Sequence, residues 1–453
     1  MTNELTTGKP MKILLKFSLP ILIGNIVQQL YYLIDSIIVG RFLGVDALAA
    51  IGSTGSVTFL FTGWIMGMTG GFSILIAQRF GANDTKGLKR YVAMSYYLCI
   101  IMAVLLTTVL LLSNQWILMV MNTPAEIFHD TYRFMRVVYI GITATIAYNM
   151  FNSILWALGD SKTPLYFLLI SSILNIILDF LFVAILPFGV AGAGYATVVS
   201  QITASVLCFI YMLRKYPMLR LKREDTIFSS AIIRQLIRIG GPMGMQFSIT
   251  AIGGMVVQMA LNGLGPIYIA AFSASGKIQN IIVQAFPSLG VSLAAYVGQN
   301  TGAGKDDRVR EGVRAAFIIT IIWSVFALLF VLILGAKFAD LFVDDSSGMV
   351  FENARTFFYV VAAFYPILGL LYLYRNALQG LGDGFVPLLG GVCELIARIM
   401  VTILLLKPFG YLGICWANPV AWVMALAPLM FVYYHRMRKQ RTKVDSINHK
   451  QEY

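Results

Sequence analysis

The strongest constraint on this chain is a repeat within its own sequence. The pattern Leu-Gly-Asp-x-x-x-Pro-Leu occupies Leu158–Leu165 and returns, about 220 residues later, at Leu381–Leu388. Two shorter patterns recur in the same order at nearly the same offset: Gln-x-x-Gly-Ala at Gln78 and Gln299, and Pro-Phe-Gly at Pro187 and Pro408. Three ordered matches indicate a duplicated half. In a hydrophobic chain, duplicated halves are a common way to build a transporter with its substrate site at the bilayer midplane.

The composition is that of a membrane protein. Hydrophobic residues make up 58% of the 453 positions and charged residues only 12%, whereas a soluble protein carries about a quarter charged residues. Apolar runs able to cross about 30 Å of hydrocarbon predict twelve spans: 14–40, 47–77, 91–113, 133–157, 165–186, 192–213, 233–263, 268–298, 315–336, 354–379, 388–406 and 411–434. We therefore expect an all-α integral membrane protein with two six-helix lobes related by a parallel repeat.

Basic residues alternate between the loops. The loops after the second, sixth and eighth spans and both termini are rich in Lys and Arg, whereas 114–130 and 264–267 contain neither. This positive-inside pattern predicts that both termini are cytoplasmic, in a multi-pass protein of the plasma (inner) membrane. It also accounts for the net charge of +13, so we expect membrane lipids as partners and no nucleic acid.

One long polar connection, from Arg214 to Ser230, lies near the middle of the chain. It predicts an N-lobe at 1–213, containing spans one to six, and a cytoplasmic linker at 214–232. The C-lobe then covers 233–434 with spans seven to twelve, and a basic cytoplasmic tail covers 435–453. We expect the N-lobe to hold a cation-coupling site, for the reasons that follow.

The first span carries a polar stripe. Asn25, Gln28, Tyr32 and Asp35 follow one another at spacings that place them on one helix face. Lipid does not tolerate such a stripe, so it should face the protein interior or a wet cavity. Pro20 removes a backbone hydrogen bond from the same helix and is a candidate hinge.

The first half contains a second intramembrane carboxylate, Asp179. Two acids with amides and a hydroxyl nearby could bind a proton or a small hard cation such as sodium, at Asp35 and Asp179, through oxygen ligands. The alternative is that the amides and the hydroxyl only hold helices together. The candidate neighbours are Asn149, Asn152, Asn175 and Thr197.

The second half does not repeat this chemistry. Thr402 stands at the position that matches Asp179, and Glu394 is followed at i+4 by Arg398, a pair that we interpret as internally compensated and structural. Lys277 and Arg375 either bind an anion or a carboxylate, or reach backbone carbonyls or the interface.

Methionine and aromatic residues in spans seven and ten suit a cavity for varied, partly cationic apolar ligands, although core or lipid-facing packing is the commoner role of such residues. The candidate substrate-cavity residues are Gln28, Tyr32, Gln246, Thr250, Met255, Lys277 and Tyr365.

With these residues in view, the chain resembles the multidrug and toxic compound extrusion (MATE) family over nearly its whole length. The resemblance is carried by Ser18–Pro20, Leu33–Gly40, Ala47–Gly52, Gln78–Ala82, the paired Leu-Gly-Asp turns, Leu174–Asp179 and Gly192–Ala196. It implies two six-helix lobes in a V shape and export driven by inward flow of protons or sodium.

The resemblance also implies roles for single residues. Asp35 matches the carboxylate of the family's N-lobe cation site, and Pro20 matches the proline where the first helix is proposed to bend. Asn149, Asn152, Asn175, Asp179 and Thr197 match neighbours of that site in the archaeal and DinF-like branches. Members resembling NorM use acids in spans seven and ten, and neither acid is present here, which leaves the N-lobe carboxylates as the coupling candidates.

We therefore expect an antiporter, coupled to protons or sodium, that exports amphipathic and mostly cationic compounds by alternating access, without a cofactor and as a monomer. The nearest alternative is a flippase for lipid-linked saccharides, which would need cationic side chains in its cavity. An intramembrane enzyme is a remote alternative, because all three histidines lie outside the predicted spans and no HExxH, GxSxG or P-loop pattern occurs.

Overall fold

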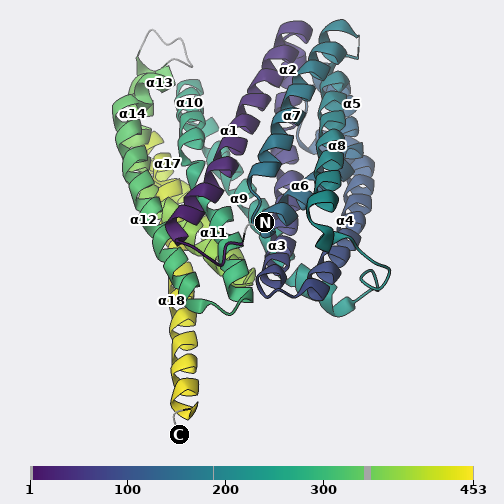
Figure 1. The fold of residues 1–453 in the computed structure, drawn as a ribbon. Helices are drawn as coiled ribbons and strands as arrows, with labels where there is room; N and C mark the ends of the chain where they lie inside the picture. The colour runs from purple at the N-terminus through teal and green to yellow at the C-terminus, as the bar shows by residue number, and fades with distance from the viewer. Residues whose placement is uncertain (1–3, 187, 341–347, 452–453) are drawn as a thin grey trace. The chain divides into compact units, whose positions relative to one another are not determined.

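The computed structural model describes residues 4–186, 188–340 and 348–451, and every regular element in those ranges is a helix (Figure 1). Pro187, which begins one of the repeated patterns, lies outside the described residues. The helices are α1 (Pro10–Leu43), α2 (Val45–Ser53), α3 (Gly55–Gly81), α4 (Thr85–Val120), α5 (Ala125–Ile140), α6 (Ile142–Ala157), α7 (Lys162–Asp179), η1 (Phe180–Ile185), α8 (Val190–Lys215), η2 (Pro217–Leu219), α9 (Ser230–Asn262), α10 (Pro266–Val283), α11 (Ala285–Gly302), α12 (Asp306–Phe330), η3 (Val331–Gly335), α13 (Ala336–Asp340), α14 (Met349–Ala362), α15 (Tyr365–Gly380), α16 (Phe385–Phe409), α17 (Tyr411–Cys415) and α18 (Ala417–Gln451).

Ten helices or helix pairs in the described residues are long and apolar enough to cross a membrane, and two bent pairs raise the number to as many as twelve. The bent pairs are α5 with α6, at 46°, and α14 with α15, at 49°. They fall in the fourth and tenth predicted spans. The second bend has a local cause, because Pro366 lies in the first turn of α15 and has no backbone N–H to continue α14. The all-α membrane architecture is thus confirmed, while the two-lobe repeat and the cytoplasmic termini stay predictions.

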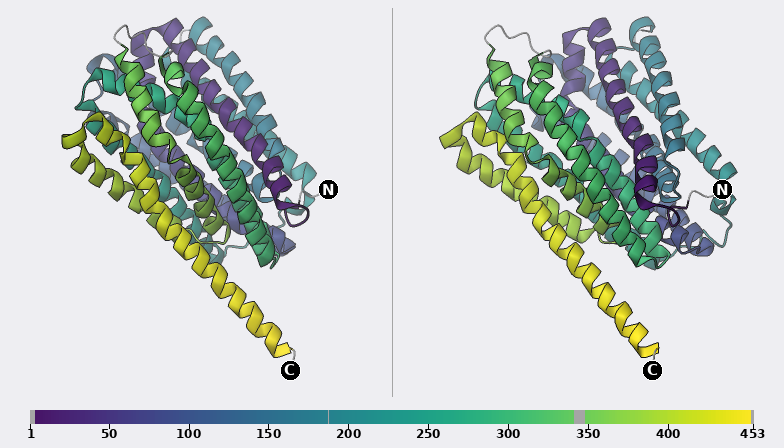
Figure 2. Two further views of the ribbon diagram at one scale, coloured as in Figure 1. Left: turned by 90° about the vertical axis from the view of Figure 1, so that its left-hand side faces the viewer. Right: turned by 60° about the vertical axis from the view of Figure 1, so that its left-hand side comes forward.

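The chain forms two compact units. Unit 1 comprises Met1–Gly8, Leu15–Ser248 and Gly298–Asp306, and unit 2 comprises Lys9–Leu14, Ile249–Val297 and Asp307–Tyr453. In unit 1, α8 packs against α5, α6 and α7, and α3 packs against α4 and α6. In unit 2, α18 packs against α15 and α16, and α10 packs against α14. The C-terminal part of α18 extends beyond the other helices of unit 2 (Figure 2).

The repeated Leu-Gly-Asp motif is a turn between two helices. Gly159 and Gly382 adopt positive φ angles of 82° and 85°, which glycine tolerates because it has no Cβ. The following aspartate then caps the next helix: Asp160 Oδ1 accepts a hydrogen bond from Thr163 N, and Asp383 Oδ1 accepts one from Val386 N, each at 3.1 Å. The motif is therefore explained by helix geometry, in both places where it occurs.

Asp160 also connects two helices of unit 1 through its second carboxylate oxygen. Its Oδ2 accepts hydrogen bonds from the hydroxyls of Thr163, at 2.8 Å, and Tyr216, at 3.1 Å, and Lys215 Nζ lies 3.9 Å away. Burial, together with this carboxylate, raises the pKa of Tyr216, which follows the last residue of α8. The phenol therefore stays neutral and donates to Asp160, which ties the end of α8 to the turn before α7.

Glycines bring α3 and α9 into backbone contact within unit 1. A Cβ on Gly67 would collide with the backbone of Met243 and Gly244, and a Cβ on Gly71 would collide with that of Gly240. Small residues four apart allow membrane helices to approach this closely.

The ends of α3 and α11 meet in a reciprocal contact that also belongs to unit 1. A Cβ on Gly81 would overlap the backbone of Gln299, and a Cβ on Gly302 would overlap the backbone of Gln78. The Gln299 side chain is fully buried, donates to the carbonyl of Ala157 at 2.8 Å and accepts from Leu5 N at 2.9 Å. The two copies of Gln-x-x-Gly-Ala thus pack on each other.

The glycine contact predicts a position-specific cost of adding one methyl group. Gly67→Ala should lower the free energy of unfolding by about 1–3 kcal/mol, because the Cβ overlaps backbone that cannot rotate away. Gly254→Ala is the matched control, since Gly254 also lies within a helix and a Cβ there meets nothing within 4 Å. Thermal unfolding of the purified variants measures the difference. Equal melting temperatures for the two variants would contradict the contact.

Candidate functional site

The two intramembrane carboxylates of unit 1 meet. Asp35 of α1 and Asp179 of α7 lie in side-chain hydrogen-bonding contact. Asp179 is fully buried, and Asp35 Oδ1 is buried with no hydrogen-bond partner among the described residues. Two carboxyl groups can share a hydrogen bond only if one of them carries a proton, because ionised carboxylates are acceptors only. The pair can therefore hold a proton between its two carboxyl groups.

The local backbone marks the same place. Asp179 is the last α-helical residue of α7, and the chain continues directly as the π-helix η1. Helix segments with i→i+5 hydrogen bonds are rare overall, and those that do occur frequently lie at functional sites.

A hydroxyl pair lies beside the carboxyl groups. The hydroxyls of Tyr31 and Thr197 are 3.2 Å apart. Tyr31 also lies close enough to Asp35 and Asp179 to interact electrostatically with both carboxyl groups. The polar stripe predicted from the sequence includes Tyr32 but not Tyr31. Because Tyr31 precedes Asp35 by four residues, one helical turn, its spacing already carried the signal.

The three candidate amides have separate surroundings. Asn149 Nδ2 donates to the carbonyl of Thr145 at 2.8 Å, within α6. Asn152 Oδ1 lies 3.6 Å from Cys208 Sγ of α8 and contacts Tyr148. Asn175 is buried one turn before Asp179. Of the predicted set, the structure therefore brings Asp35 and Asp179 into contact, and Tyr31 links them to Thr197. Asn149 and Asn152 make contacts within α6 and between α6 and α8, which is the helix-packing role that the sequence left open.

The candidate hinge lies in an unbroken helix. α1 runs from Pro10 to Leu43 with Pro20 inside it and buried. Proline has no N–H, so the carbonyl one turn earlier loses its helical donor there. One turn later, Gly24 packs against Leu165 and Leu168 of α7, the helix that carries Asp179. A hinge at Pro20 stays a prediction.

No group of three or more His, Cys, Asp or Glu side chains gathers anywhere in the described residues. A sodium ion at this site would therefore rely on Asp35 and Asp179 and on neutral oxygens, which is a donor set suited to a hard cation.

The candidate substrate-cavity residues fall in both units. In unit 1, Gln28 Nε2 donates to the hydroxyl of Tyr32 at 3.4 Å, Tyr32 is 49% exposed and Gln246 is buried. In unit 2, Met255 and Lys277 are exposed on their helices, whereas Tyr365 is fully buried. Thr250 contributes its backbone carbonyl to a polar cluster.

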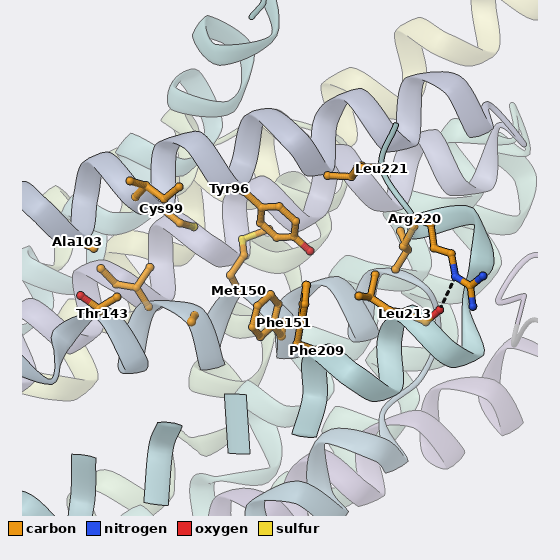
Figure 3. A pocket seen from close by; sticks show the side chains of 14 residues that line it. Tyr96, Cys99, Ala103, Thr143, Met150, Phe151, Phe209, Leu213, Arg220 and Leu221 are labelled. Atoms are coloured by element: carbon orange, nitrogen blue, oxygen red, sulfur yellow. Dashed lines mark hydrogen bonds between the residues drawn. The ribbon is translucent and has the colours of Figure 1, made fainter. Parts of the chain in front are cut away.

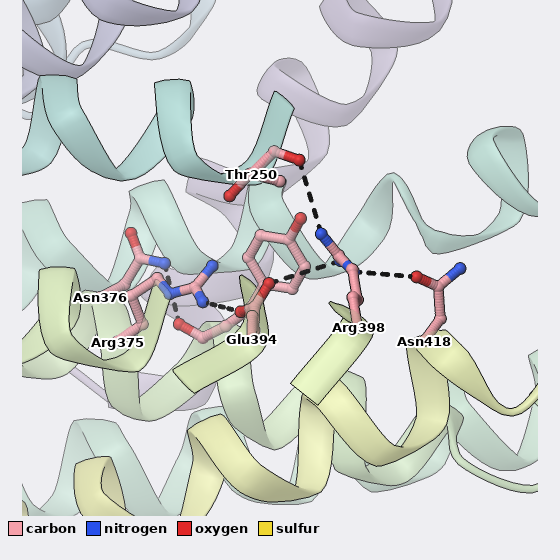
Figure 4. Close-up of polar contacts among 7 residues, drawn as sticks. Thr250, Arg375, Asn376, Glu394, Arg398 and Asn418 are labelled. Atoms are coloured by element: carbon pink, nitrogen blue, oxygen red, sulfur yellow. Dashed lines mark hydrogen bonds and ion pairs between the residues drawn. The ribbon is translucent and has the colours of Figure 1, made fainter. Parts of the chain in front are cut away.

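That cluster adds a third member to the Glu394–Arg398 pair predicted from the sequence. Glu394 of α16 accepts a hydrogen bond from Arg375 of α15 and forms an ion pair with Arg398 at 3.5 Å (Figure 4). All three side chains are at least nine-tenths buried. The predicted pair of Glu394 and Arg398 is present, and Arg375 binds the same carboxylate, which is one of the partners predicted for it. One carboxylate therefore faces two guanidinium groups, so the three side chains together carry one net positive charge.

Neutral groups complete the cluster in unit 2. Arg398 Nε donates to Asn418 Oδ1 of α18 at 3.2 Å, and Arg398 Nη1 donates to the Thr250 carbonyl of α9 at 3.5 Å (Figure 4). Gly253 makes room for it, because a Cβ there would lie 2.6 Å from Arg398 Nη1. The cluster therefore joins α9, α15, α16 and α18.

Comparisons with known proteins agree with the sequence resemblance. The MatE family model matches residues 20–181 and 242–425. The probable multidrug resistance protein YpnP of Bacillus subtilis is 26% identical over 415 residues, which cover 91% of this chain and 90% of that protein. The multidrug export protein MepA of Staphylococcus saprophyticus is 23% identical, with 94% of each chain covered.

A solved structure supports the fold. An outward-facing multidrug resistance MATE family transporter superposes with a TM-score of 0.90 at 22% identity, covering 97% of this chain and 99% of that one.

The Arg375–Glu394–Arg398 cluster predicts a strong asymmetry between acidic substitutions in unit 2. Glu394→Gln should lower the free energy of unfolding by about 3–5 kcal/mol, because two buried guanidinium groups then face each other uncompensated. Glu352→Gln is the control, since Glu352 is exposed and pairs with an exposed arginine. Thermal unfolding and monodispersity of the purified variants measure the effect. Adding Arg398→Gln to Glu394→Gln should recover part of the loss, and no recovery would contradict the charge argument.

Proposed function

The chain belongs to the multidrug and toxic compound extrusion (MATE) family, and we propose that it exports amphipathic, mostly cationic compounds by antiport coupled to protons or sodium. As a member of that family it is a transporter rather than an enzyme, and a multi-pass protein of the plasma membrane. Family members need no cofactor and use proton or sodium gradients. The natural substrates, the coupling ion and a monomeric state are part of the proposal.

The single observation that carries the proposal is the contact between Asp35 and Asp179. An ionisable side chain inside a membrane span is costly, and such residues mark ion pathways and proton relays. Two acids in contact are more costly still when both are ionised, because like charges in a low dielectric repel. The pair therefore binds one positive species at a time: a proton, a sodium ion or the cationic end of a substrate.

Mutual exclusion at one carboxyl pair yields antiport. When the pair faces outward, a proton or sodium ion neutralises it and a cationic substrate loses its counter-charge and leaves. When the pair faces inward, the ion dissociates to the cytoplasm and a new substrate binds. The ion drives the switch only if it binds the two conformations with different affinity. Bending of α1 at Pro20 would move Asp35 relative to Asp179, and we propose that this movement changes the affinity of the pair for the ion.

A flippase for an anionic lipid-linked substrate is the second candidate. The observation in its favour is the excess positive charge of the Arg375–Glu394–Arg398 cluster. The two arginines already share one carboxylate and two neutral acceptors, so we rank this function second.

The first test replaces one carboxylate at a time. In vesicles containing purified protein, Asp35→Asn and Asp179→Asn should each abolish gradient-driven efflux of a fluorescent lipophilic cation, because an amide cannot exchange a proton or hold sodium by charge. Asp46→Asn is the matched control, since Asp46 is exposed in the first turn of α2. Proton and sodium gradients are collapsed separately. Gradient-dependent efflux that persists in Asp35→Asn would overturn the coupling role.

Removing one hydroxyl of the Tyr31–Thr197 pair distinguishes sodium coupling from proton coupling. Thr197→Val removes an oxygen near the carboxyl groups but no charge. If sodium is the coupling ion, the sodium concentration for half-maximal efflux should rise several-fold, because sodium needs oxygen ligands. If protons couple transport, the dependence on the pH gradient should change little. Serine at the same position is the control that restores the hydroxyl, and identical behaviour of Val and Ser variants under both gradients would exclude a ligand role for Thr197.

A further inference from the structure

Unit 1 contains a cavity that the transport mechanism does not use. It has a volume of about 600 Å³ and lies between α4, α6, α8 and the connection that follows α8 (Figure 3). Ligand sites in proteins have volumes of roughly 300–1,000 Å³, so it can hold a sizeable ligand. The carboxyl pair at Asp35 and Asp179 is not part of its wall.

The wall is almost entirely apolar, and the open side faces outward from the helices. Met150 and Cys99 line the buried side, whereas Ile100 and Phe209 line it and are 60% and 38% exposed. Because α4, α6 and α8 belong to candidate membrane spans, the exposed faces of these residues border lipid. The occupant therefore enters from the bilayer and must itself be apolar over most of its length.

One end of the cavity carries a cation. Ala103 and Thr143 lie at the opposite end from Arg220 (Figure 3), and Arg220 lies beyond the last residue of α8, outside the candidate span. Arg220 Nε donates to the carbonyl of Leu213 at 3.1 Å, which fixes the guanidinium at the mouth. Among the described residues no ion pair includes Arg220, so its two Nη groups remain as donors.

The surroundings of the mouth attract anions. Residues 214–225 contain five basic side chains and two acidic ones: Arg214, Lys215, Arg220, Lys222 and Arg223 against Glu224 and Asp225. Asp225 already accepts a hydrogen bond from Lys222 N and lies 4.0 Å from Lys89. The excess at the mouth is therefore positive.

We propose that this cavity is a binding site for an anionic phospholipid, with one acyl chain in the apolar cavity and the phosphate on the Arg220 guanidinium. Guanidinium groups bind phosphate through paired, charge-assisted hydrogen bonds, and basic sites between membrane helices recognise acidic lipid headgroups. A free amphipathic substrate with a phosphate has the same chemistry, but the opening toward lipid and the position of Arg220 at the end of a span favour a lipid. The proposal does not depend on the transport function.

The test measures lipid binding to the purified, delipidated full-length protein. Thermal unfolding is followed while short-chain phosphatidylglycerol or phosphatidylcholine is added, and co-purified lipid is counted by native mass spectrometry. Phosphatidylglycerol should raise the melting temperature at lower concentration than phosphatidylcholine does. Arg220→Gln should weaken the response to phosphatidylglycerol about tenfold, or about 1.4 kcal/mol, and leave that to phosphatidylcholine unchanged.

Two matched pairs keep the result specific. Arg223→Gln removes an equal charge from the same connection without touching the cavity wall, and should behave as wild type. Ala147→Phe fills the cavity and should reduce the count of retained lipids, whereas Ile101→Phe adds the same ring to an exposed site outside the wall and should not.

Three results would each overturn the proposal. Equal effects of Arg220→Gln and Arg223→Gln would mean general attraction of anions to the connection. An unchanged lipid count in Ala147→Phe would place the acyl chain elsewhere. Stabilisation by inorganic phosphate alone, to the same extent and lost in Arg220→Gln, would mean a phosphate site without a lipid.

Discussion

Backbone contact between α3 and α9 is the interaction on which unit 1 depends. Helices in a bilayer gain no hydrophobic stabilisation from each other, because lipid tails are as apolar as their side chains. What holds them is van der Waals contact, and glycines at Gly67 and Gly71 bring the two backbones into it. α3 in turn supports α6, and α6 ends at the turn whose aspartate caps α7. The position of Asp179 at the other end of α7 is thus set by packing that begins far from the carboxyl pair.

The charged groups inside the spans work against stability in both units, and they do so in opposite ways. In unit 1 two acids, Asp35 and Asp179, contact each other, and both cannot be ionised without strong repulsion. In unit 2 one acid lies between two arginines, and Asn418 and the Thr250 carbonyl accept further hydrogen bonds from Arg398. The first arrangement suits the coupling site that we propose. The second is nearly satisfied from within, which suits a rigid joint between helices.

The sequence predicted the elements whose cause is local. Apolar runs predicted the membrane spans, and the intramembrane acids Asp35 and Asp179 were identified because any acid in a span stands out. Contacts between distant positions could not be predicted. Arg375 joins Glu394 from another helix, and no spacing rule relates the two. Tyr31 and Tyr32 are neighbours in sequence, and only the packing of α1 on α7 and α8 decides which hydroxyl meets Thr197. The cavity at Arg220 is formed by three helices and a connection, so the sequence of no single segment predicts it.

The reciprocal contact of Gly81 with Gln299 and of Gly302 with Gln78 has the form of an isologous interface, in which equivalent positions on two copies face each other. A half-length chain carrying one Gln-x-x-Gly-Ala segment would be complementary to a second copy of itself. If the predicted duplication holds, fusion of two such copies would turn a contact between subunits into a contact within one chain. Such a contact constrains both segments together, because any side chain larger than glycine at position 81 or 302 would overlap the backbone of the other segment.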